Sequence, residues 1–206
     1  KTESSSTTSV DSASIIDAQI DTYAHTTAIT LKLFDAQGNA LKSLPSGFSA
    51  RSMRFTLAKL IPAATEFDTP KWQSYINRSR SSSKYQSVTQ AMYETGSAGV
   101  LSYIGNGKWT YVFDFDIEQV TSPVAVSYDP TATHRVAMQF SNNKSNPYYD
   151  FVPDGSDISV KREITTVSDC NSCHDDLGLH GNGRKDIQYC VTCHNPGTTG
   201  LTSANT

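Results

Sequence analysis

Two cysteine pairs near the C-terminus constrain this chain more than any other feature of its sequence. All four cysteines form pairs that each enclose two residues, with sixteen residues between the pairs: Cys170 with Cys173, and Cys190 with Cys193. This spacing falls within the range of a zinc site with four thiolate ligands. It also fits two sites of covalent haem c attachment, because a histidine directly follows each pair, at His174 and His194.

The segment that carries these pairs is too poor in large apolar side chains to fold unaided. From Ser168 onwards there is no apolar alternation, and nearly all the large apolar residues are these: Leu177, Leu179, Ile187, Tyr189 and Val191. A segment of about 40 residues with so small a core needs a metal or another staple in order to fold. A haem would bring a large buried apolar group, whereas zinc would bring only a small metal centre.

The histidine after each pair favours haem over zinc. In a c-type site two cysteines form thioethers with the porphyrin, and the next residue lies beneath the iron, where histidine supplies an axial nitrogen. A zinc ion with four thiolates has its tetrahedral positions filled and needs no histidine there. We therefore predict two haem c groups, bound by Cys170, Cys173, Cys190 and Cys193, with His174 and His194 as axial ligands. The four-thiolate zinc site is the alternative.

Two haem irons need two further axial ligands, and three other histidines could supply them. His180 is the first candidate, because it lies between the motifs in the glycine-rich sequence LHGNGR, whose backbone can approach a flat ring. We expect it to serve the second haem, since six residues from His174 barely span the edge of a porphyrin. His134, at the start of an expected strand, is the second candidate, with a solvated histidine as the alternative. His25 is expected to be structural or on the surface.

Bis-histidine ligation would leave no open position on either iron, which predicts outer-sphere electron transfer and no catalysis at iron. A reductase with one open haem position is a further possibility, so enzymatic activity stays undecided at this point. Arg184 and Lys185, next to His180, could pair with haem propionates; solvated cations are the equally plausible alternative.

The chain before this segment has the pattern of a β protein. Residues 15–166 contain runs in which large apolar side chains alternate with polar ones, separated by Gly- and Pro-containing turns. The alternating sets are Ile29, Leu31 and Leu33; Met53, Phe55 and Leu57; Trp109, Tyr111, Phe113 and Phe115; and Val136, Met138 and Phe140. We predict an antiparallel sandwich or split-barrel domain over 15–166, followed by a short, irregular dihaem segment over 167–206. Residues 71–95, polar and Ser-rich, break the pattern and predict a long excursion with room for a short helix.

Composition limits the partners and the compartment. The net charge of −3 and the lack of a long basic run give no reason to expect a nucleic-acid partner. The longest apolar runs are far too short to span a bilayer. Residues 1–14 are polar and rich in Ser and Thr, so we expect a flexible tether, as in a mature chain that has lost its leader. Covalent haem attachment takes place outside the bacterial cytoplasm, which predicts a periplasmic or cell-surface protein.

The C-terminal sequence SDCNSCHDDLGLHGNGRKDIQYCVTCHNPGT, with the preceding THRVAMQF and NPYYDFVP, resembles the outer-membrane decahaem c-type cytochromes of metal-reducing bacteria, the OmcA/MtrC family. The sequences are closely alike over residues 133–198. Over the preceding β-rich part, the likeness is only in the expected architecture. It implies a cell-surface lipoprotein with split-barrel β domains and multihaem domains, and a periplasmic location is the alternative. It also implies bis-histidine haems, with His180 at the family's ligand position.

The same resemblance implies the partners. An outer-membrane electron conduit or a periplasmic cytochrome would donate electrons, and metal oxides, flavins or other extracellular acceptors would receive them. Contact with the membrane would come only through a lipid anchor that this chain lacks. Family members carry about ten haem motifs and this chain has two, so we expect a fragment, in which a distal ligand could come from elsewhere. The competing function is a β-sandwich binding module with a zinc-stapled C-terminal tail.

Overall fold

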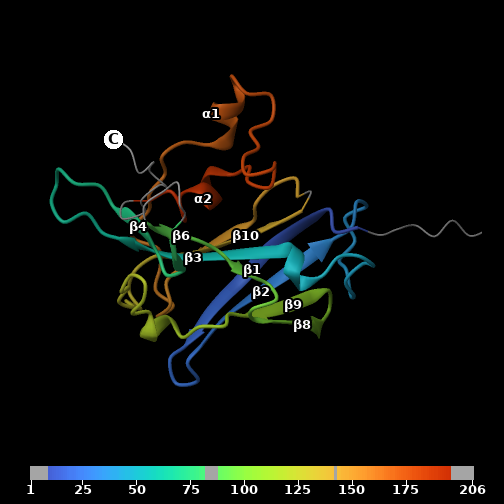
Figure 1. Ribbon diagram of the computed structural model, residues 1–206, viewed down its shortest axis with the longest axis horizontal. Coiled ribbons are helices and arrows are strands. Elements are labelled where there is room, and N and C mark those ends of the chain that lie inside the picture. Colours follow the sequence, from blue (N-terminus) through green and yellow to red (C-terminus); the bar gives the residue numbers. More distant parts are fainter. Residues whose placement is uncertain (1–8, 82–87, 142, 196–206) are drawn as a thin grey trace, which may run out of the picture.

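The computed structural model describes residues 9–81, 88–141 and 143–195, and most of its regular structure is antiparallel β-sheet (Figure 1). The first sheet has four strands in the order β1-β2-β9-β8. Their bounds are Ser12–Asp21 for β1, Thr26–Phe34 for β2, Val100–Gly105 for β8 and Lys108–Val112 for β9. The fold class predicted from the alternating runs, mainly β and antiparallel, is confirmed.

The second sheet has five strands, of which four follow the order β11-β10-β3-β4, while β7 also pairs with β3. The bounds are Met53–Ile61 for β3, Lys71–Ser74 for β4, Glu94–Thr95 for β7, His134–Phe140 for β10 and Tyr148–Phe151 for β11. Strands β5 (Asn77–Arg80) and β6 (Val88–Ala91) form a separate two-stranded sheet. Four short helices complete the described elements: η1 (Ala50–Ser52), η2 (Ile117–Gln119), α1 (Val167–Asn171) and α2 (Ile187–Cys190). None of the described helices is long and apolar enough to cross a membrane.

The main core joins the two sheets through the side chains that the alternating pattern singled out. Leu31 on β2 pairs with Trp109 on β9, and both are buried. Phe55 on β3 stacks on Tyr111 of β9, with ring centroids 4.0 Å apart, so the contact connects the five-stranded sheet to the four-stranded one. Alternation places one face of each strand in this shared core, as expected for two packed sheets.

Strand β10 differs from the alternating pattern because all seven of its residues are buried. One face contributes to the main core, whereas the other lies under the C-terminal segment, whose helix α2 contacts β10 (Figure 1). A second apolar cluster forms on this outer face from Ala58, Leu60, Trp72 and Val191, with Ile187 packed against it. The C-terminal segment thus covers a sheet face that would otherwise meet water.

Two local expectations differ from the structure. Strand β1 begins at Ser12, inside the segment expected to be a tether; residues 1–8 of that tether lie outside the described residues. The described parts of the expected excursion, 71–81 and 88–95, contain strands β4 to β7 and no helix, because pairing with β3 and with each other satisfies their backbone. Residues 82–87, and the end of the predicted dihaem segment at 196–206, lie outside the described residues.

Candidate haem-binding site

The two cysteine motifs fold into the same backbone turn. In the first, the amides of Cys173 and His174 both donate to the carbonyl of Cys170, at 3.2 and 3.0 Å. In the second, the amides of Cys193 and His194 both donate to the carbonyl of Cys190, at 3.1 and 2.8 Å. Each motif therefore continues a short helix by one turn, which keeps both cysteines and the following histidine close together.

Helix α1 forms despite its lack of buried side chains because its N-terminus is capped. The hydroxyl of Thr166 accepts a hydrogen bond from the amide of Asp169 at 3.3 Å, and the Asp169 carboxylate accepts one from the amide of Thr166 at 2.8 Å. This reciprocal pairing satisfies two amides that the helix leaves free. Those hydrogen bonds hold the pKa of Asp169 below its usual value.

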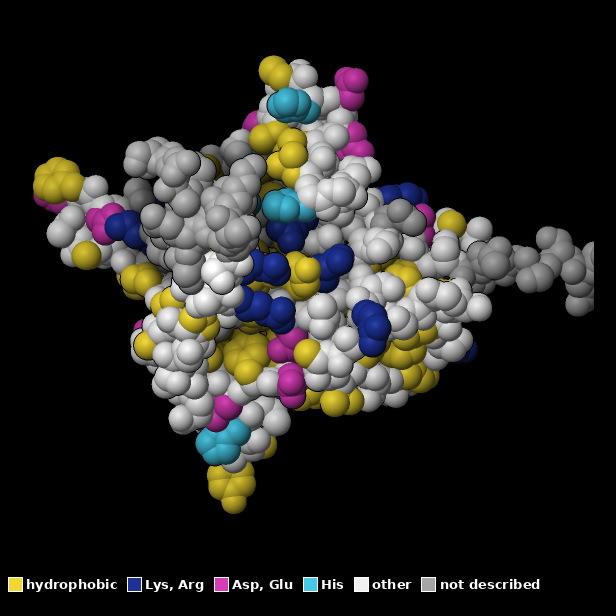
Figure 2. All heavy atoms as spheres, in the orientation of Figure 1, with side chains coloured by type: hydrophobic (Ala, Val, Ile, Leu, Met, Phe, Trp, Pro, Cys, Tyr) yellow, Lys and Arg dark blue, Asp and Glu magenta, His cyan; other side chains and the backbone are white. Residues whose placement is uncertain are grey.

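Around the second motif the structure has an apolar cavity of about 270 Å³. It is lined by side chains of the second motif, of α2 and of the loop between the motifs: Leu177, Leu179, His180, Arg184, Ile187, Tyr189, Cys190, Cys193 and His194. In Figure 2, histidine and hydrophobic side chains gather at this end of the molecule, with Lys and Arg side chains beside them. Burial raises the pKa of both Cys190 and Cys193.

His180 and His194 meet at this cavity, with ring centroids 6.1 Å apart. His180 has a φ of 51°, in the left-handed region, at the tip of a tight turn. The turn is closed by two backbone hydrogen bonds between Leu179 and Arg184, at 2.9 and 3.2 Å. Burial, and next the charge of Arg184, lower the pKa of His180, which favours the neutral imidazole that can bind a metal.

This arrangement fits a haem on the second motif. Two imidazoles that bind one metal from opposite sides have ring centres about 6 Å apart, because each metal–nitrogen bond is about 2 Å and each ring centre lies about 1 Å beyond its nitrogen. The observed separation matches that value, and both cysteines of the motif line the same apolar cavity. The structure therefore brings His180 to the cavity of the second motif, and its role as distal ligand there stays a prediction.

Polar contacts fix the segment between the motifs on the β domain, and sequence analysis missed them. The buried Asn146, in the loop before β11, donates to the carbonyl of Gly183 at 3.0 Å and accepts from the amide of Lys185 at 2.7 Å. Arg184 donates to Gln139 on β10 at 3.1 Å. The only sequence signal for Asn146 was its position in the NPYYDFVP stretch, because an isolated Asn does not reveal its partners.

Two further contacts hold α2 and its turn. The hydroxyl of Thr192 donates to that of Thr56 on β3 at 2.9 Å, and both residues are fully buried. Arg135 on β10 donates to the carbonyl of Gln188 at 3.4 Å. Tyr189 is fully buried beside them, with its hydroxyl among the buried polar atoms that lack a described partner.

The basic residues near the cavity include one that the sequence did not indicate. Arg184 and Arg54 both lie against the ring of Tyr93, at 5.7 and 5.1 Å from its centroid. Lys185, in contrast, forms an ion pair with Asp176 at 2.7 Å. Nothing in the sequence indicated that Arg54 lies close to Arg184, because Arg54 belongs to β3, more than a hundred residues before the second motif.

The first motif is more open than the second. Cys173 and His174 are exposed and Cys170 is half-buried. The four thiols do not gather in one place: over the described parts of the chain, a single group of at least three His, Cys, Asp or Glu side chains has its ligand atoms within 4.8 Å of one another, and it contains no cysteine. The four-thiolate zinc alternative is therefore not favoured.

His134 lies away from both motifs, in the interior of the β domain. Its Nε2 is 2.9 Å from the hydroxyl of Tyr75, and its Nδ1 is 2.8 Å from the carbonyl of Ala132. Burial lowers its pKa to about 4, so the ring is neutral at ordinary pH. Both ring nitrogens are engaged, and the structure does not bring this residue to a haem site. His25 lies in the β1–β2 turn, against η2.

Comparison with known proteins identifies a family and relatives that this chain resembles. Residues 12–158 match the family described as OmcA-like N-terminal domain. The chain is 27% identical, over 165 residues, to a multihaem cytochrome MtrC of Shewanella baltica (strain OS185); the match covers 73% of this chain and 23% of that protein.

Solved structures show the same likeness. The crystal structure of the outer membrane decahaem cytochrome OmcA superposes with a TM-score of 0.75 at 26% identity, covering 95% of this chain and 30% of the other. MtrC from S. baltica OS185 superposes with a TM-score of 0.66 at 22% identity, over 91% of this chain and 30% of that one, which shows the shared fold. The chain thus spans less than a third of these relatives. It belongs to the OmcA-like N-terminal domain family.

Proposed function

We propose that this chain is the N-terminal part of a multihaem c-type cytochrome that carries electrons at the outer face of the outer membrane. The observation that carries the proposal is the pairing of His180 with His194 at an apolar cavity that also contains Cys190 and Cys193. The repeated backbone turn at the first motif supports the same chemistry there. The relatives are themselves described as multihaem and decahaem cytochromes.

In this proposal the chain's own residues attach, orient and shield two haem c groups, whose irons supply reversible one-electron chemistry. Cys170 and Cys173 hold one group, with His174 as axial ligand. Cys190 and Cys193 would hold the other, and His194 and His180 would bind its iron. The apolar walls of the cavity limit water at the second site, which is one of the factors that set a potential.

The second iron then has no open position, so its role is electron transfer. The sixth ligand of the first iron is less defined. His134 stays a prediction for that place, and binding would require it to give up its hydrogen bonds to Tyr75 and Ala132. Arg184, which lines the cavity, would pair with a haem propionate, and Arg54, which lies against the same Tyr93 ring, is a second candidate.

The proposed partners follow from the relatives. An outer-membrane conduit or a periplasmic cytochrome would donate electrons, and extracellular metal oxides or flavins would accept them. The relative OmcA is described as an outer-membrane decahaem cytochrome, which supports a place of action at the outer membrane. Stopped-flow reduction of the oxidised protein tests the donor, and stopped-flow oxidation of the reduced protein tests the acceptor.

The decisive experiment is the intact mass of the denatured protein. Two covalent haems should add about 1.2 kDa to the 22.4 kDa chain. The double variant C190S/C193S should lose half of that increment, and so should C170S/C173S, whereas Ser172→Ala should retain all of it. A chain without added mass, or one that loses both haems in either double variant, would contradict two independent attachment sites.

A further inference from the structure

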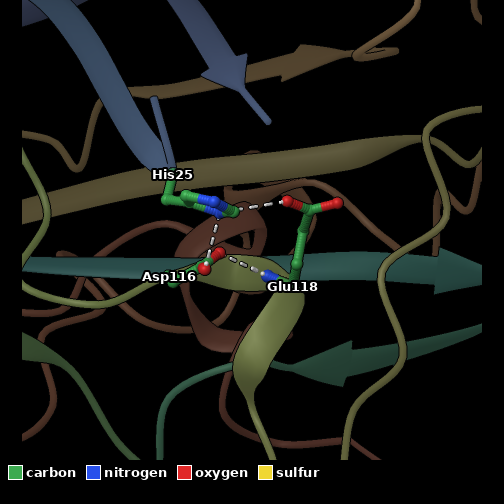
Figure 3. Close-up of side chains that lie close together, drawn as sticks. All are labelled: His25, Asp116 and Glu118. Atoms are coloured by element: carbon green, nitrogen blue, oxygen red, sulfur yellow. Dashed lines mark hydrogen bonds and ion pairs between the residues drawn. The ribbon is translucent and has the colours of Figure 1, made fainter. Parts of the chain in front are cut away.

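A second group of metal-ligating side chains lies away from the cysteine motifs, at the turn between β1 and β2. His25, Asp116 and Glu118 point toward one another there (Figure 3). The Nδ1 of His25 is 3.0 Å from an oxygen of Asp116 and 3.5 Å from an oxygen of Glu118. In Figure 1 the β1–β2 hairpin loop and helix α1 lie at opposite ends of the molecule, so this group is separate from the proposed haem sites.

Local structure holds each of the three side chains in place. His25 has a φ of 55°, and the carboxylate of Asp21 fixes its turn by accepting from the amides of Tyr23 and Ala24, at 3.0 and 2.8 Å. Asp116 is the N-cap of η2, and one of its oxygens accepts from the amide of Glu118 at 2.9 Å. Its other oxygen faces His25.

The spacing of the donor atoms suits a first-row metal ion. With metal–ligand bonds of about 2.0–2.2 Å, neighbouring donors lie about 2.9 Å apart at right angles and about 3.4 Å apart at tetrahedral angles. The two measured separations, 3.0 and 3.5 Å, fall close to these values. An ordinary hydrogen-bonded ion pair would require only the contact between His25 and Asp116, and not the second contact with Glu118.

The electrostatics of the group also favour a cation. Two carboxylates face one imidazole, and no Lys or Arg forms an ion pair with Asp116 or Glu118 in the described part of the chain. The pKa of the neighbouring Tyr128 is raised by its burial and then by the negative charge of Glu118. The His25 side chain is 61% exposed, so an ion can enter and can keep water in its remaining positions.

We propose that His25, Asp116 and Glu118 bind a divalent first-row transition ion such as Zn²⁺, with water completing the coordination. One imidazole with two carboxylates is a donor set for such ions, whereas Ca²⁺ takes six to eight oxygen ligands. The ion joins the β1–β2 hairpin to η2, two segments about 90 residues apart in the sequence. It is a site for a metal ion alone, independent of haem.

The test is calorimetric titration of Zn²⁺ into metal-depleted, haem-loaded protein, in which thioether formation has removed the cysteine thiols. We expect one site per chain, and about 10-fold or greater loss of affinity in both His25→Ala and Glu118→Gln. Glu163→Gln, an exposed carboxylate outside the group, is the matched control and should bind like the parent. Equal affinity in all four proteins would overturn the proposal, and so would the absence of a site.

X-ray absorption at the zinc edge gives a second, independent readout. The proposed site predicts nitrogen and oxygen neighbours only, with one imidazole per ion, and loss of the imidazole signal in His25→Ala. Sulfur neighbours at about 2.3 Å would instead place the ion on cysteine. That result overturns this site, whereas failure of the haem proposal would appear separately as missing covalent mass.

Discussion

The rings of His180 and His194 lie 6.1 Å apart at an angle of 45°, and both line the cavity that the second cysteine pair also lines. The two residues belong to different local structures, a tight turn and the end of a helical turn, and the β domain fixes both. Their separation equals the spacing that one shared metal imposes on two imidazoles. This relationship leads to the first prediction.

His180→Ala should open one axial position without removing either haem. The oxidised protein should gain a high-spin signal that accounts for one haem of the two, and the reduced protein should bind carbon monoxide at that haem. Visible spectra and intact mass measure both effects. His25→Ala is the control and should leave the spectrum unchanged. A low-spin spectrum that persists in His180→Ala would assign the distal position to another residue.

Asn146→Ala should loosen the C-terminal segment from the β domain. The substitution leaves the carbonyl of Gly183 and the amide of Lys185 without their side-chain partner, and each unsatisfied buried group costs about 1–3 kcal/mol. Asn146→Asp keeps the acceptor that Lys185 uses but places a buried carboxylate oxygen against the carbonyl of Gly183, so its effect should be at least as large. Hydrogen exchange of residues 179–193 and urea unfolding report the difference. Equal protection in all three proteins would contradict the anchoring role of Asn146.

Arg135→Lys should destabilise the fold by about 1–3 kcal/mol, although it preserves the charge. Arg135 makes two hydrogen bonds to Asp150, at 2.6 and 2.7 Å, and lies between the rings of Trp72 and Tyr148. A lysine cannot reproduce this two-pronged, stacked geometry. Denaturant unfolding gives the free energy, and Arg51→Lys on the exposed helix η1 should change it by little. A loss equal to that of Arg51→Lys would show that charge alone matters at position 135.

The contribution of Glu94 to the free energy of unfolding should decrease as pH rises. Burial raises the pKa of its carboxyl above the usual 4.5, although hydrogen bonds from Tyr111 and Asp114 oppose that shift. A raised folded-state pKa means that the folded state binds more protons than the unfolded state between the two pKa values. The stabilisation is therefore complete below about pH 4.5 and is lost as pH rises through the folded-state value.

The Glu94→Gln variant tests this dependence, because glutamine can still accept from Tyr111 but cannot ionise. The free energy of unfolding, measured in urea from about pH 4 to pH 8, should fall less steeply with pH in the variant than in the parent. Asp35→Asn is the control for a carboxyl whose pKa is lowered in the fold. Parallel pH curves for Glu94→Gln and the parent would mean that the pKa of Glu94 is the same in the folded and unfolded states.

The sequence alone predicted the fold class, which the structure confirms, and it predicted haem chemistry for the C-terminal segment. Alternating apolar residues such as Ile29, Leu31 and Leu33 specify strands because a strand's side chains point to opposite faces by turns. The paired cysteines and their following histidines are local in sequence, so haem chemistry could be inferred without any tertiary information. Apolar alternation could not predict the strands within residues 71–95, because these strands are polar and form by pairing with β3 and with each other.

Tertiary structure alone decided how the cysteine motifs are supported and which histidines meet. The sequence offered His180 as the first candidate ligand and His134 as the second, and in the structure His134 is buried against Tyr75 while His180 lies beside His194. Arg54 and Asn146 reach the second motif only because β3 and the loop before β11 pack under the C-terminal segment. Such contacts join residues far apart along the chain, and their partners are set by sheet register and packing, which a local pattern does not encode.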